Sequence, residues 1–449
     1  MADPNAASQG AAKAAGASSS QGNPVFRMMG MPNFRLKLPS RNWMIFLTIT
    51  GSWTAALVYD RREKRRVQKK YCDAVAHLAR ETLPTNQMQR RMTIYLAGPP
   101  ADGLMGAREH FIEYVKPILV AAAMDWDAVE GRREGDVRAQ LAERVRRVRK
   151  ERGEVSAEVE EEDADVDGVV KQARARAGIQ EWQGVQGDIV IGRNTWKEYV
   201  RGLHEGWLGP LDAPPPPPPK EELLPVSAPS DDASPTAEQP PADGATPEEK
   251  KEEEPQKSEE ELKKEEEQKK KRTQPPPYIS TADYASATLS PNCPPELGPS
   301  APVPYPHILG FLNTPVRMWR FLNRRRLADE IGAQVAAAVL AANRPYAGPE
   351  SEFAEERVVP IGDEEGDEKW EQQRLLKGEE KEWHKIVRKD AEKKREEGKE
   401  SLWCDEVVVD PRIGGRMRRF VMSEAESARV ARIMRGEEGV LGEDKKDEE

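Results

Sequence analysis

The chain has 449 residues, of which 33% are charged and 37% hydrophobic. Its formal net charge of -10 argues against a generic nucleic-acid-binding protein, because such proteins need positive charge to meet phosphates. The cysteines, Cys72, Cys293 and Cys404, are far apart and odd in number, so neither a disulfide framework nor a thiolate metal site is expected.

Residues 1–42 are predicted to form a disordered N-terminal arm. Their first half is mostly Ala, Ser, Gly and Gln, a composition that offers almost nothing to bury. A cleaved mitochondrial presequence is an open alternative. Such a presequence needs regularly placed arginines on an amphipathic helix, and only Lys13 and Arg27 precede Arg35.

Residues 43–59, WMIFLTITGSWTAALVY, carry no charge. As a helix they would span about 26 Å, which is close to the hydrocarbon core of a thin bilayer. Basic residues lie on both sides of this run: Arg35, Lys37 and Arg41 before it, and Arg61, Arg62, Lys64, Arg65 and Arg66 after it. This pattern predicts a single transmembrane helix.

Small residues repeat at a spacing of four within this run, as Gly51 with Ala55 and Ser52 with Ala56. Such pairs let a second membrane helix approach closely, so these four residues are the predicted helix-packing site. One alternative is a buried core helix, because apolar segments this short often lie in cores. A secretory signal peptide is disfavoured, since the run begins too far from the N-terminus.

The next two regions are a basic helix over residues 60–89 and an α/β domain over residues 90–212. The domain is predicted from six elements in sequence: strand 91–97, helix 104–123, strand 124–129, charged helix 132–177 with an acidic interruption, strand 187–191 and helix 196–208. Strands that alternate with helices are typical of a parallel sheet with crossover helices.

Residues 213–300 are predicted to be a disordered linker, because six consecutive prolines are followed by acidic and Glu/Lys-rich stretches with few apolar residues. A ligand for a proline-recognising partner is the alternative. Residues 301–435 are predicted to form a mixed α+β region, followed by an acidic tail over 436–449. This region is expected to contain strands 307–312, 406–409 and 418–422, helices 315–325, 327–342 and 424–434, a charged helix through Trp370, Trp383 and Ile386, and part of a second sheet.

A phosphate-binding loop would be expected after strand 187–191, where the chain reads Gly192-Arg193-Asn194-Thr195. A phosphate cradle needs successive glycines and usually a carboxylate for Mg²⁺, and only Gly192 is present. The histidines are isolated from one another, and His110 is predicted to pack or to face solvent. We therefore predict no catalytic, cofactor-binding or metal site, and no cofactor.

The segments NWMIFLTITGSWTAALVYDRR, RRMTIYLAGPP, EYVKPILVAAAMDW and DPRIGGRMRRF, taken in this order, resemble the family of fungal fifty-four-kilodalton subunits of the mitochondrial inner-membrane carrier translocase. The resemblance implies a non-catalytic scaffold or assembly subunit of the translocase that inserts multi-spanning carriers. The partners that it implies are the channel-forming subunit, small intermembrane-space chaperones and membrane lipids, with no nucleic acid.

A second resemblance joins RMTIYLAGPP, VKPIL and DIVIGRNTWKEYVRGL to the catalytic domain of diacylglycerol and acylglycerol kinases. Those enzymes carry a Gly-Gly-Asp-Gly-Thr run after the corresponding strand, of which only Thr195 and Gly192 remain. The resemblance implies a degenerate lipid-kinase fold without the activity. A membrane-anchored lipid kinase-like enzyme with an altered nucleotide loop is the alternative function, and an adaptor that works through its linker is a third.

Flanking charge and family resemblance imply opposite topologies. More basic residues follow the apolar run than precede it, which by the positive-inside rule would place the C-terminal bulk in the matrix. The resemblance implies a single-pass inner-membrane protein with a short N-terminus in the matrix and its bulk in the intermembrane space. We expect the latter, because long domains translocate largely regardless of flanking charge.

Overall fold

The computed structural model describes residues 39–156, 166–180, 182, 186–214, 275–342, 356–357, 360–362 and 368–440. Most of the predicted arm, residues 215–274 of the predicted linker and residues 441–449 of the predicted tail lie outside these ranges. The chain divides into two compact units, Met1–Tyr59 and Asp60–Glu449. Helix α2, Arg41–Val75, begins in the first unit and ends in the second.

The first unit contributes one helical stretch with exposed apolar side chains, among them Ile45, Phe46 and Val58. Its hydroxyl groups bond back to carbonyls of the same helix. For example, Thr48 Oγ1 donates to Ile45 O at 2.8 Å and Ser52 Oγ donates to Ile49 O at 2.9 Å. Within the part of the chain that the structure describes, no helix is both long enough and apolar enough to cross a membrane.

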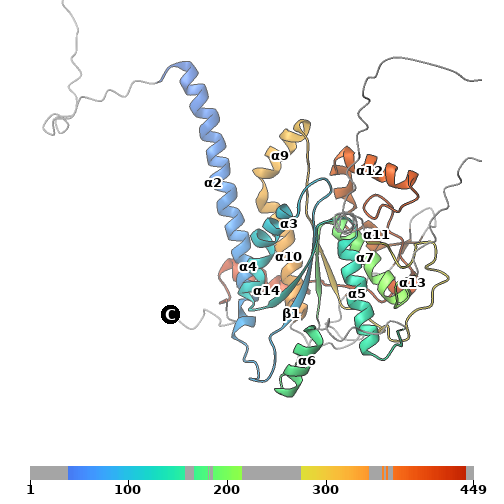
Figure 1. Ribbon diagram of the computed structural model, residues 1–449. Helices are drawn as coiled ribbons and strands as arrows, with labels where there is room; N and C mark the ends of the chain where they lie inside the picture. The colour runs from blue at the N-terminus through green and yellow to red at the C-terminus, as the bar shows by residue number, and fades with distance from the viewer. Residues whose placement is uncertain are drawn as a thin grey trace, which may run out of the picture. The chain divides into compact units, whose positions relative to one another are not determined.

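The second unit is built on a six-stranded sheet with the strand order β2-β1-β3-β4-β8-β5 (Figure 1). Its strands are β1 (Arg91–Ala97), β2 (Asp125–Gly131), β3 (Asp188–Ile191), β4 (Ser300–Val303), β5 (Glu356–Arg357) and β8 (Arg418–Arg419). Neighbouring strands from β2 to β8 pair in parallel, and only the β5–β8 pair is antiparallel. The predicted α/β fold with a parallel sheet is therefore confirmed.

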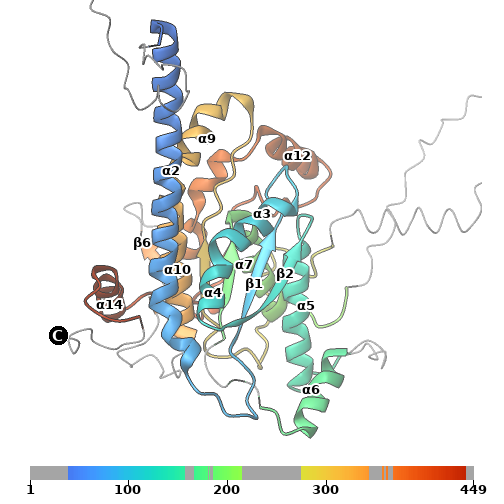
Figure 2. The ribbon, with the colours of Figure 1, turned by 90° about the vertical axis from the view of Figure 1, so that its left-hand side faces the viewer.

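Alternating side chains of the strands build two hydrophobic cores, one on each face of the sheet. On β1, Met92, Ile94 and Leu96 belong to the first core, whereas Tyr95 and Ala97 belong to the second. This is the two-residue period that places successive strand side chains on opposite faces. The result is a helix–sheet–helix arrangement in three layers, as Figures 1 and 2 show.

The first core is covered by the end of α2, by the continuous turns of α3 (Leu104–His110), the π-helical η2 (Phe111–Val115) and α4 (Lys116–Ala121), and by α10 (Arg324–Ala342). Helix α10 packs closely on α2 at Gly332. A Cβ atom there would lie 2.3 Å from Tyr71 Cδ2, and the Tyr71 hydroxyl donates to Asp329 Oδ1 at 2.8 Å. Only glycine permits this approach.

The second core is covered by α5 (Asp136–Glu151), α7 (Arg193–Leu208) and the short α13 (Pro411–Gly414). Every residue of α7 is buried. The chain that follows residue 274 also packs here, because Ile279, Tyr284 and Leu297 belong to this core. The sequence analysis predicts a linker as far as residue 300, whereas the structure describes residues 275–300 as packed chain.

The strand predicted at residues 307–312 is wrong. The strand in this part of the chain is β4, Ser300–Val303, which ends before residue 307. The predicted range instead runs into the 3₁₀ turn η3, Phe311–Asn313. Pro302 hides β4 from sequence reading, because proline lacks the N–H that a central strand needs. It is tolerated here because β4 pairs with β8 only at Ser300, so no partner strand lies opposite Pro302 on that side.

The prediction of a strand at residues 406–409 is also wrong, since these residues pair with no strand of the described chain. Backbone groups next to this segment form hydrogen bonds with side chains of α7 instead. Lys197 Nζ donates to Trp403 O at 2.6 Å, and Asp410 N donates to His204 Nε2 at 2.9 Å. The strand predicted at 418–422 shortens to β8. It joins the main sheet and not a second one.

A separate two-stranded antiparallel sheet does exist, formed by β6 (Pro360–Gly362) and β7 (Glu368–Trp370). The charged helix predicted through Trp370 and Ile386 is broken into α11 (Glu371–Arg374), η4 (Lys377–Glu382) and α12 (Lys385–Glu396). The break occurs at Leu376, which has a positive φ of 59°. The remaining elements are η1 (Ala76–Arg80), α6 (Val166–Arg176), α9 (Thr314–Phe321) and α14 (Glu424–Arg435).

Candidate functional site

The carboxyl edge of a parallel sheet is where α/β domains usually hold ligands. Here α7 begins directly after β3, and Gly192 makes the turn with a φ of +88°. The first N–H groups of a helix have no partner within it and carry partial positive charge, so they attract an anion. The start of α7 is therefore the first place to look for a phosphate site.

The side chain of Glu379 fills the anion position at this edge. Its Oε2 accepts a hydrogen bond from Arg193 N at 2.8 Å, and its Oε1 accepts one from Tyr305 N at 2.7 Å. Burial raises the pKa of this carboxyl to about 7, and the two backbone hydrogen bonds act in the opposite direction. The chain thus supplies its own carboxylate where an enzyme of this fold would hold a phosphate.

The Arg193 side chain fixes the same segment over the helix start. Its guanidinium donates to Glu380 Oε1 at 2.7 Å and to two backbone carbonyls, Leu375 O at 2.7 Å and Gln373 O at 2.8 Å. Burial favours a raised pKa for Glu380, but the hydrogen bonds and charges of Lys197 and Arg193 outweigh it and lower that pKa. Glu380 therefore faces two cations as a carboxylate.

The remaining residues of the candidate loop join α7 to β1. Asn194 Nδ2 donates to Gly98 O at 2.9 Å, and Ala97 N donates to Thr195 Oγ1 at 3.2 Å. Gly192 N donates to Val303 O of β4 at 2.9 Å. Thr195 and Gly192, the two positions that the kinase resemblance retains, thus bond to neighbouring strands at the edge of the sheet. This edge has no open phosphate cradle among the described residues.

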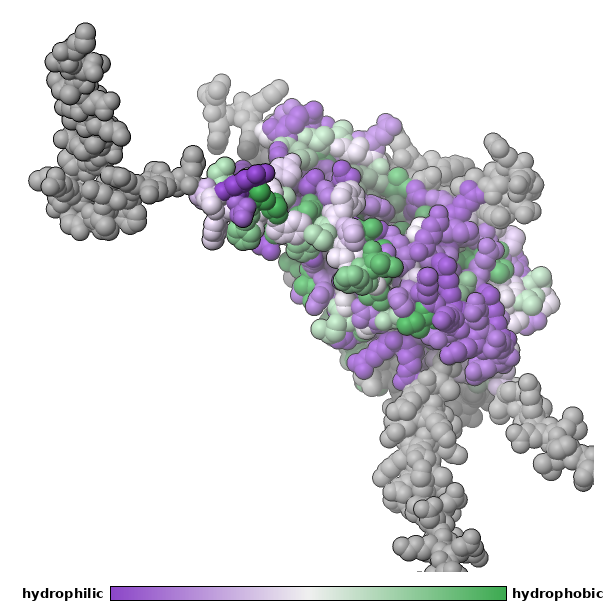
Figure 3. All heavy atoms as spheres, turned by 90° about the horizontal axis from the view of Figure 1, so that it is seen from above, coloured by the Kyte–Doolittle hydropathy of each residue, from purple (hydrophilic) through white to green (hydrophobic). Residues whose placement is uncertain are grey.

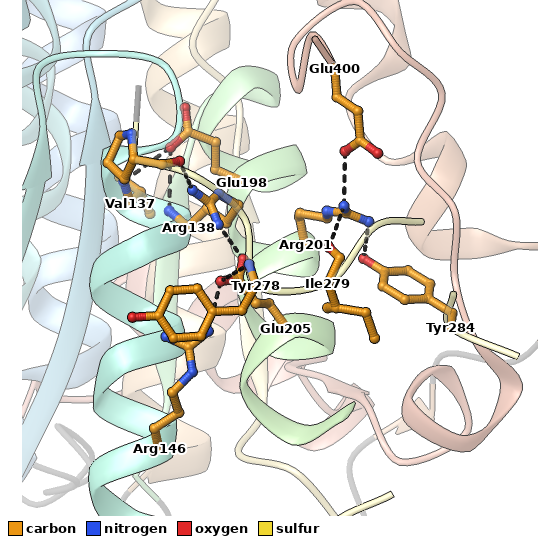
Figure 4. Close-up of polar contacts among 11 residues, drawn as sticks. Val137, Arg138, Arg146, Glu198, Arg201, Glu205, Tyr278, Ile279, Tyr284 and Glu400 are labelled. Carbon is orange, nitrogen blue, oxygen red and sulfur yellow. Dashed lines mark hydrogen bonds and ion pairs between the residues drawn. The ribbon is translucent and has the colours of Figure 1, made fainter. Parts of the chain in front are cut away.

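A buried charged network lies on the other side of α7 (Figure 4). Glu205 of α7 accepts hydrogen bonds from Arg138 and, at 2.7 Å, from Arg146 Nη2, both on α5. It also accepts one from Tyr278 N at 3.2 Å, and the Arg146 guanidinium lies over the Tyr278 ring at 3.7 Å. Three segments that are distant in sequence therefore meet at one carboxylate.

Arg201 extends this network to the C-terminal region. Its guanidinium donates to Ile279 O and to Glu400 Oε2, each at 2.9 Å, and to the Tyr284 hydroxyl. The sequence analysis does not identify these buried carboxylates. The signal is the seven-residue spacing of Glu198 and Glu205, which places both on the face of α7 that meets α5.

Glu198 caps the start of α5. Its Oε2 accepts Val137 N at 3.0 Å, and its Oε1 accepts Trp403 Nε1 at 2.7 Å. Burial raises its pKa to about 7. Glu198 and Glu379 thus both accept backbone N–H groups at the start of a helix, Glu198 at α5 and Glu379 at α7. Both side chains therefore stabilise the fold.

The buried histidines belong to the core. His110 Nε2 donates to Pro304 O at 3.1 Å, and His204 Nδ1 donates to Val200 O at 2.7 Å. Burial lowers the pKa of each to about 4, so both are neutral at physiological pH. The packing predicted for His110 is confirmed. Cys72, Cys293 and Cys404 are free thiols.

The predicted membrane-helix packing residues lie on α2 within the first unit. Gly51, Ser52 and Ala55 are exposed and Ala56 is half-buried. A Cβ at Gly51 would meet no atom within 4 Å. Residues four apart share one face of a helix, so these four form a strip of small side chains that is open to contact.

A second exposed surface is apolar and lies on η3 and α9. It consists of Phe311, Leu312, Val316, Met318 and Trp319, and we call it the α9 surface. None of the residues in these two elements is buried. The sequence analysis predicts the helix but not its exposure, because apolar residues on a helix normally indicate a face that is packed on a core.

The chain matches known proteins over most of its length. The model of the family described as "Inner membrane protein import complex subunit Tim54" matches residues 23–420. The chain is 51% identical over 422 residues to the mitochondrial import inner membrane translocase subunit tim54 of Aspergillus oryzae, covering 92% of each chain. It is 51% identical to the Neurospora crassa subunit over 94% of this chain and 85% of the relative. For the Schizosaccharomyces pombe subunit the identity is 35%, over 66% and 76%.

Proposed function

Because this chain belongs to the Tim54 family of inner membrane protein import complex subunits, we propose that it acts as a scaffold that assembles other subunits of the complex. As a subunit of the mitochondrial import inner membrane translocase it is a non-enzymatic protein of the mitochondrial inner membrane. The finer role proposed here is to support the insertion of multi-spanning carrier proteins.

One observation carries the scaffold proposal. The position where an α/β enzyme binds phosphate is filled by Glu379, which accepts hydrogen bonds from Arg193 N and Tyr305 N. A domain closed in this way offers surfaces and not a reaction centre. The alternative of a lipid kinase-like enzyme with an altered nucleotide loop would require this contact to open and a metal-binding carboxylate to be supplied.

The proposed anchor is the apolar run of residues 43–59. Its side chains are exposed to a high degree, with Ile49 at 63% and Val58 at 67%, so the helix needs an apolar environment. Its hydroxyls already bond to carbonyls of the helix, which reduces the cost of leaving water. We place the short N-terminus in the matrix and the second unit in the intermembrane space.

The proposed partners follow from two surfaces. The small-residue strip of Gly51, Ser52, Ala55 and Ala56 suits close packing against a membrane helix, which in a carrier translocase would belong to the channel-forming subunit. The second unit, with its sheet edge closed, would present its surface to small intermembrane-space chaperones. Membrane lipids are the third proposed kind of partner, and nucleic acid is not expected to bind.

Co-purification tests the scaffold role. The tagged full chain, isolated from detergent-solubilised mitochondria, should bring down a multi-spanning channel subunit and migrate on native gels as part of a large complex. A lone monomer would contradict the proposal. A tagged unrelated single-span protein of the same membrane serves as the control for non-specific capture.

Two further measurements test the anchor and the topology. Alkaline carbonate should leave the chain in the membrane pellet, and release into the supernatant would contradict the anchor. Protease added to mitochondria with ruptured outer membranes should remove a C-terminal tag. Protection of the tag under these conditions would place the second unit in the matrix.

A further inference from the structure

The α9 surface exposes more apolar area than an isolated surface residue would. Phe311 and Leu312 are each 90% exposed, and Trp319 is 55% exposed. Leu312, Val316 and Trp319 follow one another at spacings of four and three, so they share one side of the η3–α9 segment. Contiguous exposed apolar residues of this kind mark a binding surface.

The segment is held firmly by polar contacts on its other side. The Arg320 guanidinium donates to both oxygens of Glu382, with Nη1 to Oε2 at 2.6 Å. Asn313 Nδ2 donates to Leu309 O at 2.7 Å and closes the turn that leads into the helix. The apolar side chains are therefore presented by a fixed element and do not come from a loose loop.

Basic side chains surround the apolar ones. The Arg324 guanidinium lies 4.7 Å from the centre of the Phe321 ring, and Arg326 lies 5.5 Å from that of Trp319. Arg317 is exposed on α9, and no ion pair to it is found among the described residues. Figure 3, which looks onto the end of the molecule where α9 lies in Figure 1, shows hydrophobic and strongly hydrophilic residues next to each other.

A direct contact ties this segment to the beginning of the second unit. The side chain of Asp60, only 4% exposed, accepts hydrogen bonds from Arg325 N at 3.3 Å and Arg325 Nη1 at 3.2 Å. Asp60 is the residue that directly follows the apolar run 43–59. The exposed Arg61, Arg62 and Arg65 come next. The α9 surface is thus held, through Arg325, close to the residue that directly follows the proposed anchor in the chain.

We propose that the α9 surface binds the surface of an anionic lipid bilayer, with Phe311, Leu312 and Trp319 in the interfacial layer and the neighbouring arginines on lipid headgroups. Aromatic and aliphatic residues interleaved with arginine are typical of elements that lie in the membrane interface. The Asp60–Arg325 contact favours lipid over a protein groove, because it holds this surface beside the chain's own exit from the apolar run. The proposal adds a second membrane contact to the anchor.

The test uses the full chain reconstituted into vesicles of phosphatidylcholine alone or of phosphatidylcholine with phosphatidylglycerol. Cys72, Cys293 and Cys404 are first changed to serine. An environment-sensitive fluorophore is then attached to a single cysteine at Leu312→Cys, with Phe311→Cys as a second site. The matched control is Val155→Cys, which is 93% exposed and is carried by the same anchored chain.

Fluorescence at residue 312 should shift to the blue and be quenched by nitroxide-labelled acyl chains, whereas that at residue 155 should not. The double substitution Arg317→Glu with Arg326→Glu should reduce the quenching in phosphatidylglycerol vesicles. Equal fluorescence at residues 312 and 155 would overturn the proposal, as would equal quenching in both kinds of vesicle. Shielding of residue 312 only when other translocase subunits are added would assign the surface to a protein partner instead.

Discussion

The carboxylate of Glu379 accepts a hydrogen bond from the backbone N–H of Arg193 at 2.8 Å, although the two residues are 186 positions apart in the chain. The contact closes the helix start of α7 and ties the C-terminal region to the edge of the sheet. The backbone donor at this helix start therefore has an internal carboxylate as its acceptor, at a position where a phosphate-binding loop would use a ligand.

Replacing Glu379 with alanine should destabilise the second unit by about 1–3 kcal/mol, because it leaves two enclosed N–H groups without an acceptor. Urea unfolding of the detergent-solubilised full chain, followed by tryptophan fluorescence, would measure the loss. Lys377→Ala, an exposed position in the same η4, should change stability by less than about 0.5 kcal/mol. Equal effects of the two substitutions would show that the Glu379 contact contributes little.

The pKa of Glu198 should appear as a pH dependence of stability. Burial raises the pKa of this carboxyl from 4.5 to about 7 in the folded chain, so the folded state binds more protons than the unfolded state between those values. The contribution of Glu198 to the free energy of unfolding therefore falls as the pH rises through this window. Glu198→Gln removes this term.

The free energy of unfolding of Glu198→Gln, minus that of the wild type, should therefore increase as the pH rises from about 4.5 to about 7. Comparing variant with wild type at each pH cancels the groups that they share. The same substitution at the exposed Glu143 on α5 controls for the removal of one charge. A constant difference between Glu198→Gln and the wild type would mean that the folded pKa is not raised.

Gly332→Ala should weaken the packing of α10 on α2, since its Cβ would lie 2.3 Å from the Tyr71 ring. Overpacking of this kind typically costs about 1–3 kcal/mol. Thermal unfolding followed by circular dichroism would report the loss as a lower midpoint. Glu330→Ala, on an exposed position of the same helix, should leave the midpoint nearly unchanged.

The parts of the fold that follow a local pattern could be predicted from the sequence. The β-branched and aromatic residues of 91–97, closed by Gly98-Pro99-Pro100, identify β1 over its full length, and the short apolar run at 189–191 identifies β3. Strand β4 could not be found in this way, because Pro302 breaks the local pattern and only its place between β3 and β8 makes it a strand.

For the candidate site, the sequence predicts only that a phosphate cradle is lacking, and it does not predict what takes its place. The lack of glycines after Gly192 indicates that no phosphate cradle forms, but nothing local to Arg193 or Glu379 indicates that they meet. The α9 surface illustrates the same limit. The sequence predicts a basic helix with Trp319 and Phe321, whereas the contacts that leave its apolar side uncovered come from Glu382 and Asp60, which are distant in sequence.

Glu205→Ala should be among the most damaging single substitutions in the second unit. It leaves Arg138 and Arg146 buried without their carboxylate, and breaking a buried ion pair in this way costs about 3–5 kcal/mol. Hydrogen exchange should rise first around residues 278–284, which the network holds. The exposed pair of Arg144 with Asp127 is the matched comparison, and Asp127→Ala should cost less than about 1 kcal/mol.

Leucine at Gly51 and Ala55 together should separate the chain from its membrane-helix partner without releasing it from the membrane. The larger side chains would block close approach along the small-residue strip while adding apolar surface. Native gels should show the complex lost, and carbonate washing should still leave the chain in the pellet. Leucine at Val58, outside the strip, is the control. An intact complex in the double variant would rule out this strip as the contact.

Residues 215–274, predicted from the sequence as part of a linker, should be removable. The described chain on either side is bound to one helix: Arg149 of α5 donates to Gly209 O at 2.8 Å, and Arg138 of α5 donates to Pro275 O. These two residues lie about 16 Å apart along the helix, and a bridge of about ten residues reaches up to about 33 Å. A short Gly/Ser bridge should thus preserve the fold and the assembled complex, measured by unfolding and native gels. A folded chain that no longer assembles would show instead that the excised sequence is the working part, and an equally long Gly/Ser replacement would separate its length from its composition.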